Sequence, residues 1–164
     1  IIDYENSTYN TEQKNWTDLR DHVVRATGEP PFLTAWAHGA GGIGLARLEL
    51  LKSGLFNTNS VILTDLHNAI STTLSTGFTK NLSLAVGSFG NIELLLNYLE
   101  ITDDKQLKGV FNEILNYLCN AYLNSDYHIC YPIKSLGLMA GVTGIGYECL
   151  RVLRPDIVRS VLVL

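Results

Sequence analysis

The chain has 164 residues, of which 46% are hydrophobic and 17% are charged, and its formal net charge is −4. This balance excludes the basic surface that nucleic-acid binding requires, so we expect no nucleic-acid partner. No apolar stretch reaches the roughly 18 residues of a membrane span, and the start lacks the pattern of a secretory signal. Three Cys residues are too few for a disulfide framework, which favours a cytoplasmic location.

Apolar residues at helical spacing predict an all-α chain. Residues 1–14 are expected to be a polar connecting segment, and residues 15–164 form the domain proper. The last apolar stretch, residues 158–164, is too short to assign. The predicted helices span Trp16–Ala26, Gly41–Lys52, Ser60–Ser75, Phe89–Glu100, the segment from the Thr102-Asp103-Asp104 cap to Leu123, and Gly141–Leu153. The helix that ends at Leu123 has a predicted buried stripe of Leu107, Val110, Phe111, Ile114, Leu115, Leu118 and Ala121.

One pattern, Gly-x-x-Gly before an apolar run, occurs three times, and its copies begin 48 and then 54 residues apart. Leu follows the first Gly after nine and after twelve residues in every copy. The Gly pairs are Gly39 and Gly42, Gly87 and Gly90, and Gly141 and Gly144. Glycines at helix starts allow close backbone packing, and a repeat of this length indicates stacked helical hairpins. We therefore predict an α/α toroid or solenoid, with the Gly-entered helices in the inner layer.

The residues around these glycines carry a family resemblance. WAHGAGGIGLAR at 36–47, SLAVGSFGN at 83–91 and GLMAGVTGIGY at 137–147 resemble the three C-terminal signatures of lanthionine synthetase cyclase domains. RPD at 154–156 and SVLVL at 160–164 resemble the C-terminus of class II lanthipeptide synthetases. The resemblance implies a partial toroid, the C-terminal portion of a cyclase domain.

The same resemblance implies an activity on a ribosomal precursor peptide whose Ser and Thr residues have been dehydrated. The family adds a peptide Cys thiol to a dehydrated residue and so forms a thioether ring. The implied partners are the leader-containing precursor peptide and the remainder of the synthetase, including its dehydratase region. The implied family cofactor is zinc, because a thiol that coordinates zinc is deprotonated.

The positions at which the family carries its zinc ligands, two Cys and one His, hold Ala37, Ala85 and Val86 in this chain. None of these side chains has a donor atom for a metal. We therefore predict no metal site and no cofactor here.

His38 follows Ala37, at a position where the family carries a residue that handles protons near the reacting thiol. Imidazole titrates near neutral pH, so His38 is our candidate catalytic acid or base. The alternative is that His38 hydrogen-bonds the backbone at a crowded helix start.

A competing metal site would use Cys119, His128 and Cys130. His128 and Cys130 are close in sequence, and Cys119 would reach them from the preceding helix. Against this interpretation, a free Cys on an apolar helix ordinarily behaves as a small hydrophobic side chain.

Two function classes follow. The first is an enzyme portion in which cyclisation is zinc-independent or impaired. The second is a non-catalytic, degenerate cyclase domain that holds the precursor peptide as a scaffold. A deliberate Cys-to-Ala replacement is a third explanation of the missing ligands, although Val86 argues against it.

Overall fold

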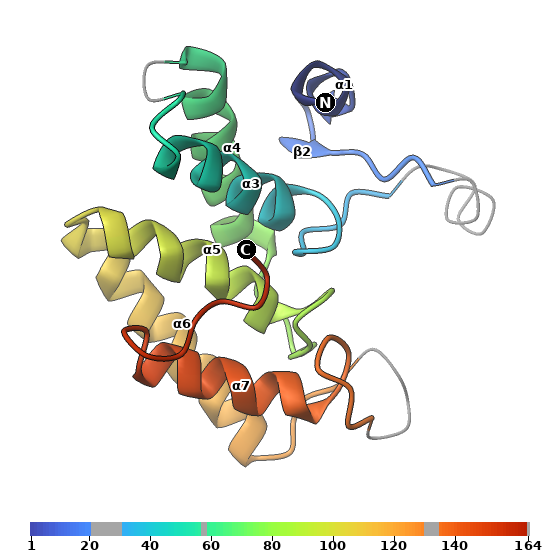
Figure 1. The fold of residues 1–164 in the computed structure, drawn as a ribbon. Coiled ribbons are helices and arrows are strands. Elements are labelled where there is room, and N and C mark those ends of the chain that lie inside the picture. Colours follow the sequence, from blue (N-terminus) through green and yellow to red (C-terminus); the bar gives the residue numbers. More distant parts are fainter. Residues whose placement is uncertain (21–30, 57–58, 130–134, 164) are drawn as a thin grey trace.

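The computed structural model describes residues 1–20, 31–56, 59–129 and 135–163. Over these residues the fold is all-α, as predicted, apart from one two-stranded antiparallel hairpin (Figure 1). None of the helices in these ranges has the length and apolar character that a bilayer crossing needs. The helices are α1 (Ile2–Ser7), α3 (Ala40–Lys52), α4 (Ser60–Thr76), α5 (Ser88–Ile101), α6 (Lys105–Leu123) and α7 (Val142–Leu153), and the strands are β1 (Tyr9–Asn10) and β2 (Asn15–Trp16).

The helices α3 to α7 confirm five of the predicted helices to within one or two residues at each end. Their ends follow the expected capping chemistry: the Asp104 side chain accepts a hydrogen bond from the backbone N–H of Leu107 at 2.8 Å and so caps α6. Asn59 caps α4 in the same way.

The prediction of a helix that begins at Trp16 is wrong at its start. Asn15 and Trp16 form strand β2, and residues 17–20 are irregular. The cause is tertiary: the Asn15 side chain donates to Leu33 O at 3.1 Å and accepts from Ala40 N at 2.9 Å, which holds this stretch extended. The rest of that prediction, residues 21–26, lies outside the described residues.

Residues 1–14, expected to be a connecting segment, contain α1 and β1. Arg47 of α3, which is 1% exposed, ties α1 to the helical body. Its guanidinium binds Glu5 of α1 at 2.7 Å and Asp65 of α4 at 2.9 Å. The N-terminal segment therefore packs against the body through a buried ion pair.

The Gly-entered helices α3, α5 and α7 lie in one layer, and α4 and α6 pack behind them, as the predicted alternation requires (Figure 1). Helix α5 lies in the middle, in contact with each of the other four. The main apolar core gathers around it. Its fully buried members include Leu82, Leu84, Ile92, Leu95 and Leu118.

Two apolar patterns are more exposed than the sequence predicts. Val110 of the expected α6 stripe is 38% exposed, because it borders an open groove between α4 and α6. In the Gly-entered helices, Leu48 and Leu96 are buried, whereas the corresponding Leu150 is 57% exposed. Within the described residues, α7 packs against α5 as its inner-layer neighbour, so its other flank remains uncovered.

Candidate functional site

The three Gly-x-x-Gly motifs build the same local structure. The first Gly of each motif is the N-cap of its helix. A Cβ atom on any of the six glycines would overlap the carbonyl oxygen of the residue six positions earlier, so only glycine lets each loop fold back onto its helix start. Those carbonyls belong to Leu33 and Trp36, Asn81 and Leu84, and Ser135 and Leu138.

Backbone hydrogen bonds join the three loops side by side. Ala37 N donates to Ala85 O at 2.8 Å, and Ala85 N donates to Met139 O at 2.8 Å. Each of these residues stands two positions before the first Gly of its motif. This backbone ladder brings together the positions that the sequence singled out, because Ala37 and Ala85 are bonded neighbours and Val86 follows directly.

Two buried amides hold the first loop against its surroundings. Asn15 bonds both ends of this loop, through Leu33 O and Ala40 N. Asn91 of α5 donates at 2.8 Å to Thr34 O. Buried side-chain amides that hydrogen-bond the backbone hold a loop in one geometry, and the residue presented at the end of this loop is His38.

His38 lies beside a fixed carboxylate. Its side chain is 22% exposed, and its Nδ1 atom is 4.0 Å from Oδ2 of Asp18. Arg20 binds the Asp18 carboxylate through two of its nitrogens, at 2.6 and 2.9 Å. These bonds lower the pKa of Asp18 to about 2, so a negative charge faces the imidazole at neutral pH.

The sequence did not point to Asp18 as a partner of His38, because the two residues are 20 positions apart. The only local signal was the Asp-x-Arg spacing, which is compatible with an ion pair but does not locate that pair in space. Among the described residues, Glu5 of α1 and Leu162 and Val163 near the C-terminus also line a cavity with His38, and the sequence did not indicate them.

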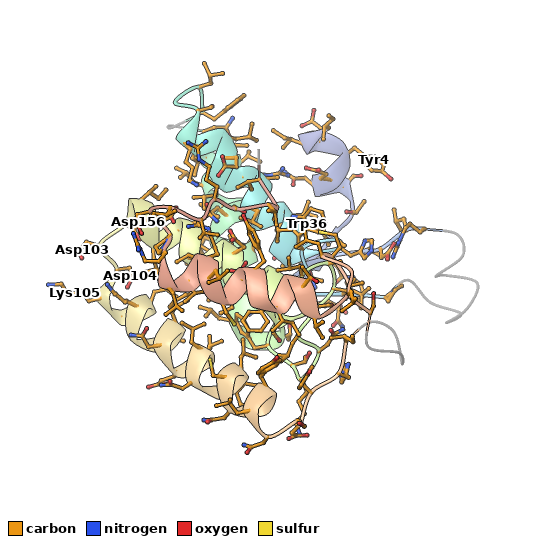
Figure 2. The ribbon with its side chains drawn as sticks, turned by 60° about the horizontal axis from the view of Figure 1, so that its bottom comes forward. Tyr4, Trp36, Asp103, Asp104, Lys105 and Asp156 are labelled. Atoms are coloured by element: carbon orange, nitrogen blue, oxygen red, sulfur yellow. The ribbon has the colours of Figure 1, made fainter. Side chains whose placement is uncertain are left out.

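Two cavities meet at His38. One, of about 280 Å³, lies between the first loop and α1 and is lined by polar residues that include Glu5, Asp18 and Arg20. The other, of about 320 Å³, is lined by Trp36, Ala37 and His38 together with C-terminal residues. Figure 2 shows Trp36 on the side of the molecule that carries α1 and Tyr4, away from the charged residues at the start of α6.

The competing metal site gains no support from its described members. Cys119 is exposed on α6, and His128 is exposed in an isolated parallel β-bridge with Asn81. Within residues 1–20, 31–56, 59–129 and 135–163, no three His, Cys, Asp or Glu side chains form a metal-binding group. Cys130 lies outside these ranges, so the three-residue set stays a prediction.

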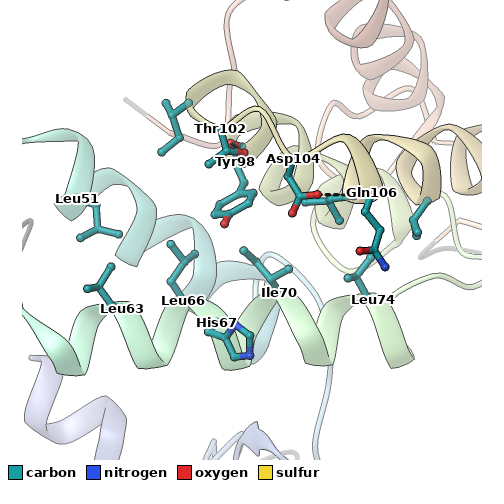
Figure 3. Close-up of a pocket in the computed structure, with 13 residues that line it drawn as sticks. Leu51, Leu63, Leu66, His67, Ile70, Leu74, Tyr98, Thr102, Asp104 and Gln106 are labelled. Atoms are coloured by element: carbon teal, nitrogen blue, oxygen red, sulfur yellow. Dashed lines mark hydrogen bonds between the residues drawn. The ribbon is translucent and has the colours of Figure 1, made fainter.

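A separate groove of about 590 Å³ runs between α4 and α6, over the end of α5 (Figure 3). Its lining is mainly aliphatic, with Leu66, Ile70 and Leu74 of α4 facing Tyr98 of α5. The carboxylate at its rim, Asp104, already caps α6. His67 of α4 and the capping carboxylate of Asp104 are the acid and base groups on this mainly aliphatic lining.

A buried acidic group lies between α5 and α7. Glu93 accepts hydrogen bonds from Asn97 at 2.6 Å and from Arg151 at 3.2 Å. Glu148 is fully buried, and no donor in the described part of the chain bonds its carboxyl oxygens, whereas its protonated form hydrogen-bonds Glu93. Burial, with the nearby charge of Glu93, raises the pKa of Glu148 to about 9, so this carboxyl is protonated at neutral pH.

Comparisons with known proteins identify the same family as the motifs in the repeated loops. The family model described as "Lanthionine synthetase C-like protein" matches residues 1–163. The chain is 33% identical over 152 residues to the "Lacticin 481/lactococcin biosynthesis protein LcnDR2" of Lactococcus lactis subsp. lactis. That match covers 85% of this chain and only 16% of the relative.

Proposed function

The chain belongs to the lanthionine synthetase C-like family, and from that membership we propose that it takes part in forming thioether rings in a ribosomal precursor peptide. The relative in Lactococcus lactis is named for the biosynthesis of lacticin 481. The observation that carries the proposal is the backbone ladder through Ala37, Ala85 and Met139. It supports a retained frame for the site in which the three loops meet beside His38.

In the proposed reaction, a peptide Cys thiol adds to the double bond of a dehydrated Ser or Thr residue. The S–H bond breaks, a bond forms between sulfur and Cβ, and the π electron pair moves to Cα, which takes up a proton. The step is proton-neutral overall and needs no oxidant or reductant. It does need a group that accepts the thiol proton and one that protonates Cα.

Zinc, which the family implies, does not fit this chain. The side chains of Ala37, Ala85 and Val86 offer no nitrogen, oxygen or sulfur donor, whereas catalytic zinc sites normally take three ligands from the protein. The proposed reaction therefore uses side chains of the protein and no metal ion. His38, at the junction of the two cavities, takes the thiol proton and returns a proton to Cα, with the Asp18 carboxylate facing its imidazole.

The proposed partners are a leader-containing precursor peptide and the other regions of a lanthipeptide synthetase, including a dehydratase region. We assign the reaction to the cytoplasm, where reducing conditions keep peptide Cys residues as thiols.

A second candidate function is favoured by the aliphatic side chains at the three family ligand positions. In this alternative the domain is a non-catalytic scaffold that binds the precursor peptide while its rings close elsewhere. Both candidates use the same frame, and they differ in whether the protein accelerates loss of the peptide thiol.

The test uses the full-length protein and a synthetic peptide that carries one dehydroalanine and one free Cys. Thiol alkylation followed by mass spectrometry measures ring closure over time. We expect the free thiol to disappear faster than in a protein-free control, and the His38→Asn variant to lose most of that acceleration. A rate equal to the control, with the peptide still bound, would reject the catalytic proposal and favour the scaffold.

A further inference from the structure

The chain beyond α7 turns back across the inner layer (Figure 1). We name residues 155–163 the C-terminal strap; they contain no helix or strand. Several hydrogen bonds anchor this strap, and three of them come from side chains of α7 and of the first loop. Arg151 donates to Pro155 O at 3.1 Å, Tyr147 donates to Arg159 O at 2.7 Å, and Trp36 Nε1 donates to Leu162 O at 3.3 Å.

The end of the strap is buried. Leu162 is 9% exposed and packs in a cluster with Leu45 and Leu48 of α3 and Leu94 of α5. Met139 of the third loop packs against the same cluster. The strap therefore starts at the third Gly-entered helix and ends against the first, across the place where the three loops meet.

This course puts the strap at the candidate site. Leu162 and Val163 line the cavity of about 320 Å³ that also contains Ala37 and His38. Glu5 contributes an acidic group to that cavity. The strap thus supplies an apolar wall to a cavity whose polar groups are His38 and Glu5.

We propose that the C-terminal strap is a specificity-determining wall, in which Val163 contacts an apolar peptide residue next to the reacting Cys. Leu162 anchors the strap, and the half-buried Val163 packs against the same apolar cluster and also lines the cavity. The inference rests on the proposed function, because the occupant is the Cys-bearing segment of the precursor peptide. An apolar wall selects its ligand by burying apolar surface and by rejecting a charge that would lose its hydration.

The experiment compares two synthetic peptides that each carry one dehydroalanine and one free Cys, with Leu next to the Cys in one and Asp in the other. Binding to the full-length protein is measured by fluorescence anisotropy. We expect the Leu peptide to bind about tenfold more tightly than the Asp peptide. Val163→Lys should reduce this ratio to near one or reverse it, because it places a positive charge in the wall.

Ile157→Lys is the matched control, since Ile157 lies in the same strap but is 63% exposed and should leave the ratio unchanged. Val163→Ser is a smaller change, measured in the same way as Val163→Lys. It should also lower the ratio of the affinities for the Leu and Asp peptides. Thermal melting confirms that each variant is folded.

If the protein binds both peptides and neither Val163 variant alters the ratio, the strap inference is overturned while the proposed function stands. An equal effect of Ile157→Lys would also overturn it. If neither peptide binds the unmodified protein, both proposals fail.

Discussion

The buried carboxyl of Glu148 predicts a stability that falls as the pH rises. Its pKa is raised from 4.5 to about 9 in the folded protein, so folding favours the protonated form. The contribution of Glu148 to stability is therefore greatest below pH 4.5 and declines until the pH reaches about 9. At about 1.4 kcal/mol per pH unit, the cost of keeping Glu148 protonated at pH 7 is about 3 kcal/mol.

Glu148→Gln removes this cost, because the amide is neutral at every pH and has nearly the same shape. We expect the free energy of unfolding at pH 7 to rise by up to about 3 kcal/mol, and the difference to shrink toward zero near pH 4.5. The assay is urea denaturation at pH 5, 6, 7 and 8. Glu113→Gln, at an exposed position of α6, is the control and should follow the unmodified protein.

Parallel stability curves for Glu148→Gln and the unmodified protein between pH 5 and 8 would refute this reasoning. So would a variant that is less stable at pH 7. Parallel curves would mean that Glu148 is ionised in the folded protein and that Arg151 compensates its charge.

Three further predictions concern the loops and the site. Gly90→Ala should destabilise the protein by about 3 kcal/mol, because its methyl group overlaps Leu84 O; Gly109→Ala, which meets no atom within 4 Å, should stabilise α6 by up to about 1 kcal/mol. Thermal denaturation checks both, and equal melting temperatures would contradict the close-approach argument. Asp18→Asn should lower the free energy of unfolding at pH 7 by about 2 kcal/mol, because the amide binds Arg20 more weakly than the carboxylate does. Because the pKa of Asp18 is lowered to about 2, the loss should fade as the pH approaches 2 in chemical denaturation, and a loss that is independent of pH would argue against it. The triple variant Ala37→Cys, Ala85→Cys, Val86→His should bind about one zinc ion per chain, as measured by metal analysis. A zinc content no higher than that of the unmodified protein would show that these three positions do not converge.

Local chemistry made much of the helical framework predictable. Apolar spacing located α3 to α7, and the Asp104 cap set the start of α6. These signals lie within a few residues of the element that they define. The repeated glycines likewise predicted helix starts, because each repeat carries its own loop and helix.

The contacts that were missed depend on residues far apart in the chain. Trp16 was predicted to be helical, but its neighbour Asn15 bonds Leu33 and Ala40 and holds the stretch extended. The meeting of Asp18 with His38 depends on the same long-range packing. Leu162 lies in an apolar stretch too short to show a period, so its burial between α3 and α5 could not be read from spacing.

The ladder through Ala37, Ala85 and Met139 uses main-chain atoms alone. Side chains at the first two positions can therefore be exchanged while the loops remain bonded to one another. A frame held by main-chain bonds is therefore compatible with the aliphatic side chains that this chain carries at those positions. Zinc binding by the triple variant would mean that three side-chain exchanges are enough to turn this frame into a metal centre.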